Sequence, residues 1–264
     1  MSGNLIAVRG TTVEVPRHDG VPLHVAPEIV HHFDTHFAGF ADRTSFQDRA
    51  LLTHRIDVVL TRVAVEVEVA LQRATGDAWS DLWGWGPGGM GPSVGGDTFP
   101  IARAEILEFP ARLRNELHTT WSDWLGDIDA EMALAGVGAD DLAERPDTLA
   151  LANGSLLFVR SVRVHHAFLG QNVGARVLAH ALWVLSRAPG DLAMLVARPS
   201  PHPLQGASEL DVSGLVRYCE RIGFTRAWPD EPVTATSAVL LFAMPGKRPL
   251  RFSGLGTLGG DDGW

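Results

Sequence analysis

The stretch VRVHHAFLGQNVGARVL, residues 162–178, sets the fold that this chain is expected to adopt. It begins in a run dense in Val, Leu and Phe, residues 156–164, which predicts a strand. Gly170 and Gly174 mark the turn that follows, and the apolar pattern beyond it predicts a helix over 173–188. Such a turn leaves backbone N–H groups unpaired at the positive end of the helix dipole. Because glycine has no Cβ atom, a phosphate group can approach these N–H groups closely.

The elements after this stretch follow a sharp pattern. An apolar strand is predicted over 192–197, a helix over 210–222 that stops at Gly223, and a final strand over 234–244. The order strand, turn, helix, strand, loop, helix, strand predicts an α/β fold with a mixed sheet. Two glycines four residues apart are a weak signal on their own, so a strand–helix turn that binds no ligand stays an alternative.

The first half is less regular, but it predicts further strands and helices. Short β-like pieces fill residues 1–26, and apolar residues at three- and four-residue steps predict a helix over 27–55. Valines at alternate positions predict a strand around 63–69, which would pair as a wide hairpin with a strand over 101–109. The remaining segments are a long glycine-rich loop at 79–98, a helix over 110–135 and an acidic connection at 136–153.

These elements indicate a main domain with an added N-terminal layer. We expect residues 1–55 to form strands and a helix that pack on a domain of residues 56–252. The glycine-rich residues 253–264 are expected to form a flexible tail.

The composition excludes several classes of function. The 264 residues carry 22 Lys and Arg against 31 Asp and Glu, and this net charge of −9 argues against a nucleic-acid partner. A single cysteine rules out an intramolecular disulfide and a zinc site built from several thiolates. The chain shows no long apolar run and no signal peptide, so we expect no membrane partner and a cytoplasmic location. His32 and His36 lie four residues apart, but no third ligand accompanies them, and no bound metal is expected.

The stretch quoted above resembles the acyl-CoA motif of the GNAT superfamily of N-acetyltransferases. In that family a strand leads into an Arg/Gln-x-x-Gly-x-Gly/Ala loop and then a helix. Residues 195–201 resemble the family's splayed fifth strand with its exit loop, and residues 216–224 resemble its late helix, which commonly ends in Tyr-x-x-x-Gly-Phe. The resemblance covers residues 154–244. It implies an α/β fold with a mixed, mostly antiparallel sheet and flanking helices, and acetyl-CoA or another acyl-CoA as co-substrate.

The resemblance also assigns a role to each matched position. Val162, Arg163 and Val164 would offer edge backbone groups to the pantetheine arm, in the manner of an added strand. The pyrophosphate would lie in a cradle of backbone N–H groups. The residues of that cradle would be Gly170, Gln171, Asn172, Val173, Gly174 and Ala175.

The chain departs from the family pattern at three places. Leu169 stands where the family usually has Arg or Gln, and Asn172 stands where it usually has Gly, although Asn tolerates left-handed backbone. Counting back from Gly223, the family's frequent general-acid Tyr falls on Cys219, while Tyr218, the only tyrosine, comes one place earlier. Both Tyr218 and Cys219 are therefore candidate catalytic residues. Plain packing is the alternative for Cys219, because free cysteines are often buried.

The implied activity is transfer of an acetyl group from acetyl-CoA to an amine, carried by a small molecule or a peptide. The alternative is a protein of the same fold that binds acyl-CoA without turning it over, as a sensor or scaffold, and a domain with neither property is a third reading. A carboxylate would serve as base, but the sequence does not separate Glu105, Glu108 and Asp129. A homodimer is left open.

Overall fold

The computed structural model of the chain describes residues 4–7, 13–15, 23–25, 27–34, 52–61, 98–126, 128–145, 154–164, 168–198, 212–234 and 238–245. The strands are β1 (Asn4–Ala7), β2 (Val13–Val15), β3 (Leu23–Val25), β4 (Glu28–Asp34), β5 (Leu52–Thr61), β6 (Thr98–Phe109), β7 (Leu156–Val164), β8 (Leu192–Ala197), β9 (Thr225–Arg226) and β10 (Val239–Ala243). The helices are α2 (Ala111–Leu117), α3 (Trp121–Leu125), α4 (Ala130–Glu144), α5 (Val173–Leu185) and α6 (Val212–Ile222).

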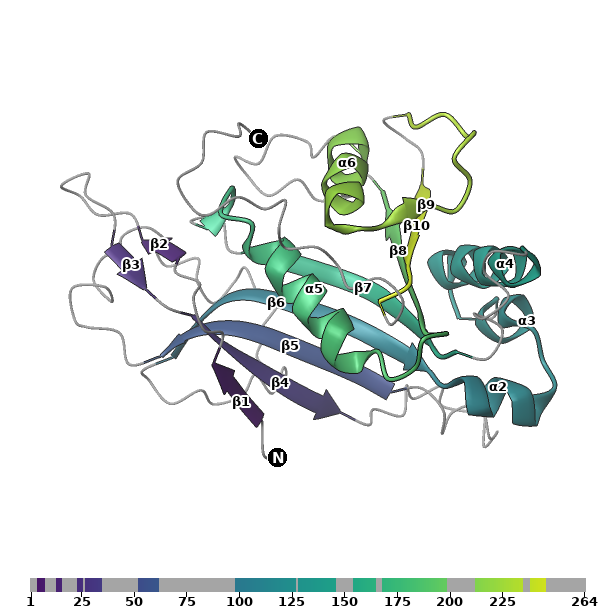
Figure 1. Cartoon of the computed structure of the whole chain (residues 1–264), viewed down its shortest axis with the longest axis horizontal. Helices are drawn as coiled ribbons and strands as arrows, with labels where there is room; N and C mark the ends of the chain where they lie inside the picture. The colour runs from purple at the N-terminus through teal and green to yellow at the C-terminus, as the bar shows by residue number, and fades with distance from the viewer. Residues whose placement is uncertain are drawn as a thin grey trace.

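Within these residues one large sheet runs through the molecule in the order β1-β4-β5-β6-β7-β8-β10-β9 (Figure 1), while β2 and β3 pair separately. Neighbouring strands are antiparallel except β7 and β8, which are parallel and are connected by α5. The predicted α/β class is therefore confirmed: the sheet is mixed and mostly antiparallel, and helices flank it.

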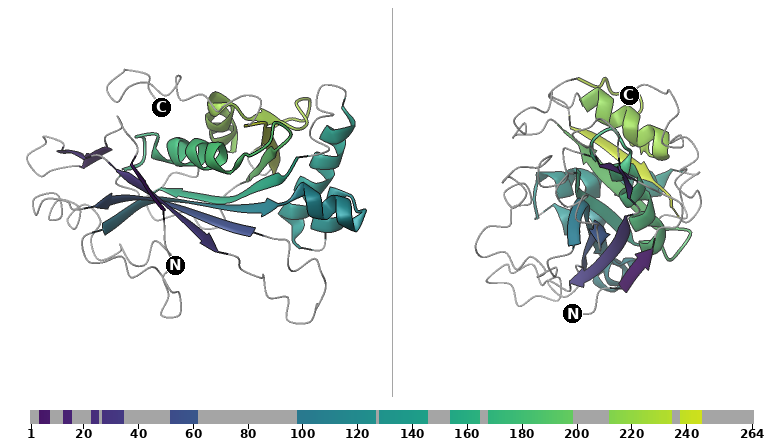
Figure 2. Two further views of the ribbon diagram at one scale, coloured as in Figure 1. Left: turned by 60° about the horizontal axis from the view of Figure 1, so that its bottom comes forward. Right: turned by 90° about the vertical axis from the view of Figure 1, so that its left-hand side faces the viewer.

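The two faces of the sheet are covered by different helices. Helices α5 and α6 lie over one face (Figure 2), where they share a hydrophobic core with β5 to β8 and β10. Helices α3 and α4 form a second core with the opposite face of β6 to β8 and β10. Strand β7 serves both cores, since Leu157 and Val159 face α5 whereas Leu156 and Phe158 face α4. A strand buried on both sides reads as a continuous apolar run, which is why this segment was predictable.

The second half of the chain follows the sequence prediction closely. The predicted strands over 156–164 and 192–197 are β7 and β8, and the predicted helices correspond to α5 and α6. The final strand is shorter than predicted and spans only Val239–Ala243. Helix α5 ends at Leu185, just before the Pro189-Gly190 turn.

The helix predicted over 27–55 is wrong. Residues 28–34 form β4 and residues 52–55 belong to β5, and these two strands pair along seven residues, from Glu28↔Val59 to Asp34↔Thr53. The segment is rich in β-branched and aromatic residues, and its pairing with distant strands overrides the weak helical spacing. The boundary expected between residues 55 and 56 falls inside β5.

The single helix predicted over 110–135 is also wrong, because three helices replace it. Helix α2 ends where His118 adopts a left-handed backbone with φ of 49°, and Thr120 then caps α3 by accepting a hydrogen bond from the N–H of Asp123. Asp129 caps α4 in the same way through the N–H of Met132. Helix α4 continues to Glu144, so the first part of the predicted acidic connection is helical.

The predicted hairpin exists, but with a different first strand. Strand β6 pairs antiparallel with β5, residues 52–61, rather than with residues 63–69. The strand predicted around 63–69, the glycine-rich loop at 79–98 and the tail at 253–264 lie outside the described residues.

Asp191 fixes the register of the parallel strands. Its buried carboxylate accepts hydrogen bonds from the N–H groups of Ser155 (2.9 Å), Arg187 (2.6 Å) and Ala188 (2.8 Å). Because Ser155 precedes β7 and the other two residues follow α5, this single side chain ties the start of β7 to the start of β8.

We expect Asp191→Ala to be strongly destabilising. It leaves three part-buried amide donors without their acceptor, and an unsatisfied donor costs about 1–3 kcal/mol when it is buried. A total of about 3 kcal/mol corresponds to a fall in Tm of roughly 6–12 °C, measured by thermal unfolding. Asp191→Asn keeps one acceptor oxygen and should lose less. Asp230→Ala, at an exposed position, is the control. If its Tm fell as much as that of Asp191→Ala, the role of Asp191 in joining β7 to β8 would be contradicted.

Candidate functional site

Strands β7 and β8 separate after a short common stretch. Their parallel pairing runs from Leu156↔Leu192 to Val159↔Leu195 and goes no further. Beyond that point β7 stays paired with β6 on its other side, up to Val164↔Ala102, while β8 stays paired with β10. Among the described residues, the edge of β7 that faces β8 therefore has no ladder partner over residues 160–164. This opening between the two strands is called the split below.

A bulge in β7 lies where the split begins. Glu105 of β6 is opposite Ser161 and Ile106 is opposite Val159, so Arg160 has no partner in the ladder. A β-bulge bends its strand and increases the local twist. The bend turns β7 away from β8, and it leaves the side chains of Val162 and Val164 directed toward α5.

The turn that precedes α5 takes the backbone conformations that its sequence requires. Gly170 has a φ of 80°, and Asn172, the N-cap of α5, has a φ of 57°. Asn172 thus adopts the left-handed conformation that made it an acceptable replacement for glycine. Phe168 anchors the turn in the core and accepts a hydrogen bond from the N–H of Gln171, while Leu169 is 55% exposed.

The first N–H groups of α5 differ in how they are satisfied. The N–H of Arg176 donates to the carbonyl of Asn172, and the N–H of Ala175 donates to the hydroxyl of Tyr218 at 2.6 Å. Within the described part of the chain, the N–H groups of Val173 and Gly174 have no acceptor. Two donors at the positive end of a helix of 13 residues are thus available to an anion.

Gly174 lies where helix α5 packs closely against β7. A Cβ atom built on it would lie 3.0 Å from Val164 Cγ2, 3.5 Å from Val162 Cγ1 and 3.6 Å from the Tyr218 hydroxyl. The absence of a side chain therefore lets α5 approach β7 closely. This approach brings the free N–H groups of α5 next to the open edge of the split.

Tyr218 and Cys219, adjacent on α6, lie in different surroundings. The hydroxyl of Tyr218 reaches the start of α5, and burial raises the pKa of this tyrosine to about 12, against the lowering effect of the Ala175 N–H. Cys219 is 2% exposed within the core between α5, α6 and the sheet, and burial raises the pKa of its thiol to about 12. The geometry therefore favours the packing interpretation of Cys219 and directs Tyr218 toward the site.

Arg176 is a residue of this site that the sequence analysis missed. It is half-buried in the first turns of α5, where the helix dipole disfavours a cation. Burial lowers the pKa of the Arg176 guanidinium, and the neighbouring Tyr218 opposes this shift. Within the described residues Arg176 forms no ion pair. A basic residue just after a helix start, against the usual preference for acidic residues, was the signal that could have identified it.

The opposite face of the split carries a carboxylate. Side chains alternate along β6, so Ala104 and Ile106 face α5 while Glu105 faces away from it. Glu105 is half-buried, receives a hydrogen bond from Ser161 at 3.4 Å beside the bulge, and forms no ion pair with a described residue. The nearby Arg103 is engaged by the buried Asp57 through two hydrogen bonds of 2.6 and 3.1 Å.

The structure separates the three carboxylates that the sequence left equivalent. Glu108 is buried against His54 Nε2 at 2.8 Å, at the end of β6 that lies away from the split. Asp129 is the N-cap of α4. Of these three, Glu105 is the one that lies beside the split.

Among the described residues, no group of three or more His, Cys, Asp or Glu is arranged to hold a metal ion. None of the described helices combines the length and the apolar character needed to cross a membrane. His36, His165 and His166 lie outside the described part of the chain. His32 belongs to β4, but its side chain is not described.

Sequence comparisons and structural comparisons give different results for this chain. No family model matches the chain, and no curated protein matches it. Among solved structures, the chain is similar to the crystal structure of Arabidopsis thaliana NAA60 in complex with a bisubstrate analogue. The two are 10% identical, with a TM-score of 0.31, over 80% of this chain and 95% of that chain. A likeness of this strength concerns the fold at most and bears on neither the chemistry nor the residues of the site.

Cys219 gives a prediction about alkaline pH. Its folded pKa of about 12 lies above the ordinary 9.0, so above pH 9 the unfolded chain loses a proton that the folded protein keeps. The stabilisation is complete below pH 9 and is lost as the pH rises toward 12. We expect the free energy of unfolding, measured with urea, to fall over this range, and Cys219→Ala to reduce the slope by about 1.4 kcal/mol per pH unit at most. A slope that Cys219→Ala leaves unchanged would contradict the buried, protonated thiol.

Proposed function

We propose that the chain is an N-acyltransferase that moves an acetyl group from acetyl-CoA to an amine acceptor. One observation carries the proposal: the edge of β7 beyond Val159, which no described strand covers, lies against the start of α5, where two N–H groups have no acceptor among the described residues. A free strand edge suits the amide groups of pantetheine, and a helix N-terminus suits a pyrophosphate. The resemblance of residues 162–178 to the acyl-CoA motif points to the same ligand.

The residues at the split fit an acyl-CoA. Val162, Arg163 and Val164 offer the free strand edge, and the N–H groups of Val173 and Gly174 offer the anion site. Arg176 adds a positive charge that the described chain does not neutralise. The cradle is completed by the turn and first helical residues Gly170, Gln171, Asn172 and Ala175, the last of which first has to release the Tyr218 hydroxyl.

Bound acetyl-CoA would supply an activated acyl thioester at this position. The acceptor amine reacts in its neutral form, so a base has to take its proton. Glu105 is the proposed base, because its carboxylate lies beside the bulge and has no described cation to hold it. Tyr218 is the proposed proton donor to the departing thiolate, because its hydroxyl lies at the start of α5, within 2.6 Å of the Ala175 N. Cys219 is the second candidate for that role and is placed less favourably by its burial.

The alternative function is a sensor or scaffold that binds acyl-CoA without turning it over. Leu169 at the position of the family's Arg or Gln and the buried Cys219 at the position of its Tyr favour this alternative. Release of free thiol from acetyl-CoA, followed across a panel of small and peptide amines, separates the two functions. The transferase requires amine-dependent thiol release, whereas the sensor binds CoA with none.

We expect CoA and acetyl-CoA to stabilise the folded protein. A ligand at 100 times its Kd adds about 2.7 kcal/mol to the free energy of unfolding. For a chain of this size that gain corresponds to an increase in Tm of roughly 5–10 °C. Thermal unfolding with and without the ligand measures it, and ATP, which lacks the pantetheine arm, is the control. If millimolar acetyl-CoA left Tm unchanged, both functions proposed here would fail.

Arg176→Gln should weaken CoA binding without weakening the fold. A hydrogen bond to a charged group contributes about 1.5–3 kcal/mol, so the Kd for CoA should increase about tenfold or more. The unliganded variant should have the same Tm as the wild type or a higher one, because the substitution removes a half-buried cation from the positive end of α5.

Three controls accompany this variant, with all affinities measured by calorimetry. Arg187→Gln, at an exposed position just beyond the other end of α5, should change neither the Kd for CoA nor the Tm of the unliganded protein. Dephospho-CoA should lose as much affinity as CoA in Arg176→Gln, because both retain the pyrophosphate, whereas pantetheine should lose none. A lower Tm together with unchanged CoA affinity would mean that Arg176 is structural.

A further inference from the structure

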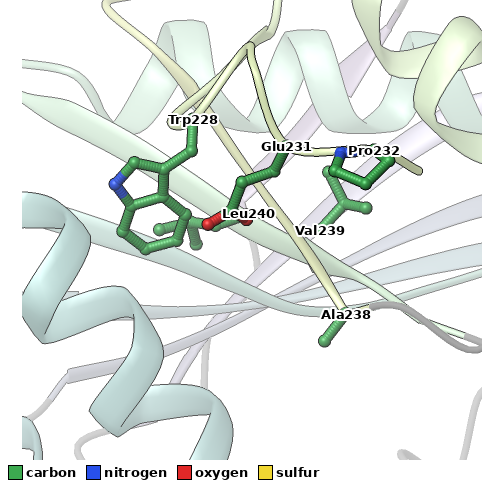
Figure 3. Close-up of a pocket in the computed structure, with 6 residues that line it drawn as sticks. All are labelled: Trp228, Glu231, Pro232, Ala238, Val239 and Leu240. Carbon is green, nitrogen blue, oxygen red and sulfur yellow. The ribbon is translucent and has the colours of Figure 1, made fainter. Parts of the chain in front are cut away.

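A small hollow opens at the outer edge of β10, away from the split. It has a volume of about 180 Å³ and is lined by Trp228, Glu231, Pro232, Ala238, Val239 and Leu240 (Figure 3). Strand β9 pairs with β10 at Leu241 and Phe242, and the N–H of Ala227 donates to the carbonyl of Leu240 at 3.0 Å. Among the described residues, no strand covers the edge of β10 before Leu240. One wall is formed by residues 228–232, which follow β9.

A tight turn places an aromatic ring and a carboxylate together in this hollow. The N–H of Glu231 donates to the carbonyl of Trp228 at 3.3 Å, which closes a four-residue turn whose second position is Pro229. Proline and aspartate suit the central positions of such a turn, and its first and fourth residues lie side by side. The Glu231 side chain extends toward the indole of Trp228 (Figure 3).

The carboxylate of Glu231 has no cation among the described residues, although two arginines contact this loop. Arg226 pairs with Glu220 at 3.4 Å and reaches only the backbone carbonyl of Glu231. Arg145 pairs with Asp141 and donates to the carbonyl of Ala227 at 2.8 Å. The hollow therefore presents one unneutralised negative charge beside an aromatic ring.

We infer that the hollow formed by Trp228 and Glu231 binds an alkylammonium group. The carboxylate would neutralise the ammonium, the indole would add a cation–π contact, and Pro232, Val239 and Leu240 would pack against the methylene groups. An anion is disfavoured by Glu231, and a neutral alcohol would leave that charge unpaired.

The position of the hollow relates it to the split. Leu240 is opposite Val196 on β8, one residue beyond the last pair that joins β8 to β7. The hollow is thus level with the split along the strands and, at about 4.8 Å per strand, roughly 10 Å to its side. If the proposed transferase function holds, on which this step rests, the acceptor is an amine with a second cationic group at about that distance, such as a polyamine or a basic peptide.

Titration with n-butylammonium tests the hollow without any need for CoA. The readout is the indole N–H signal of Trp228 in ¹H–¹⁵N NMR spectra of the full chain, assigned among the eight tryptophans with Trp228→Phe. We expect a saturable shift with a millimolar Kd in the wild type. Glu231→Gln should weaken binding at least about fivefold. The matched control Asp230→Asn, a neighbouring exposed carboxylate that does not line the hollow, should weaken it less than twofold.

Several outcomes would overturn the inference. They are the absence of a saturable Trp228 shift at tens of millimolar butylammonium, equal weakening by Glu231→Gln and Asp230→Asn, and an equal response to butanol or butyrate. The CoA-dependent increase in Tm is measured on the same Glu231→Gln protein. An increase that persists while butylammonium fails to bind rejects the hollow and keeps the proposed function. Butylammonium binding to the wild type without any effect of CoA on Tm keeps the hollow and rejects the proposed function.

Discussion

The rest of the structure depends on the short parallel pairing of β7 with β8, which is stabilised at its first end and stops at the other. Asp191 holds the first end, because its carboxylate binds the N–H of Ser155 and two N–H groups that follow α5. The bulge at Arg160 releases the other end by bending β7 while it stays paired with β6. If the pairing continued, the edge of β7 would be satisfied by β8 and α5 would begin against a closed sheet.

The start of α5 combines features that stabilise the fold with features that do not. Gly174 lets the helix approach Val164, and the hydroxyl of Tyr218 satisfies the N–H of Ala175. Arg176, in contrast, is a half-buried cation near the positive end of a helix, and nothing in the described chain neutralises it. Local rules are usually broken where a protein binds or reacts, because a ligand then offsets the cost.

The two sides of the split differ in electrostatic character. The α5 side presents N–H groups and Arg176, which attract an anion, whereas the opposite face presents the carboxylate of Glu105. The hollow beside β10 adds a second carboxylate, that of Glu231, which no described cation neutralises. An anionic acyl donor on one side and a cationic acceptor on the other would suit this arrangement, and the chain's net charge of −9 agrees with a cationic acceptor.

The sequence alone determined the elements that are buried on both sides or punctuated by glycine and proline. Strands β7 and β8, helix α5 and the left-handed Asn172 were predictable because local propensity and tertiary packing agree there. Tertiary structure decided the rest. Residues 28–34 became a strand through pairing with β5, and Glu105, Glu108 and Asp129 took different roles only through their neighbours. Three further features depend on contacts between distant segments or on backbone geometry: the split, the hydrogen bond from Ala175 to Tyr218, and the turn that joins Trp228 to Glu231. The spacing of apolar residues along a chain does not report such contacts, so that spacing did not predict them.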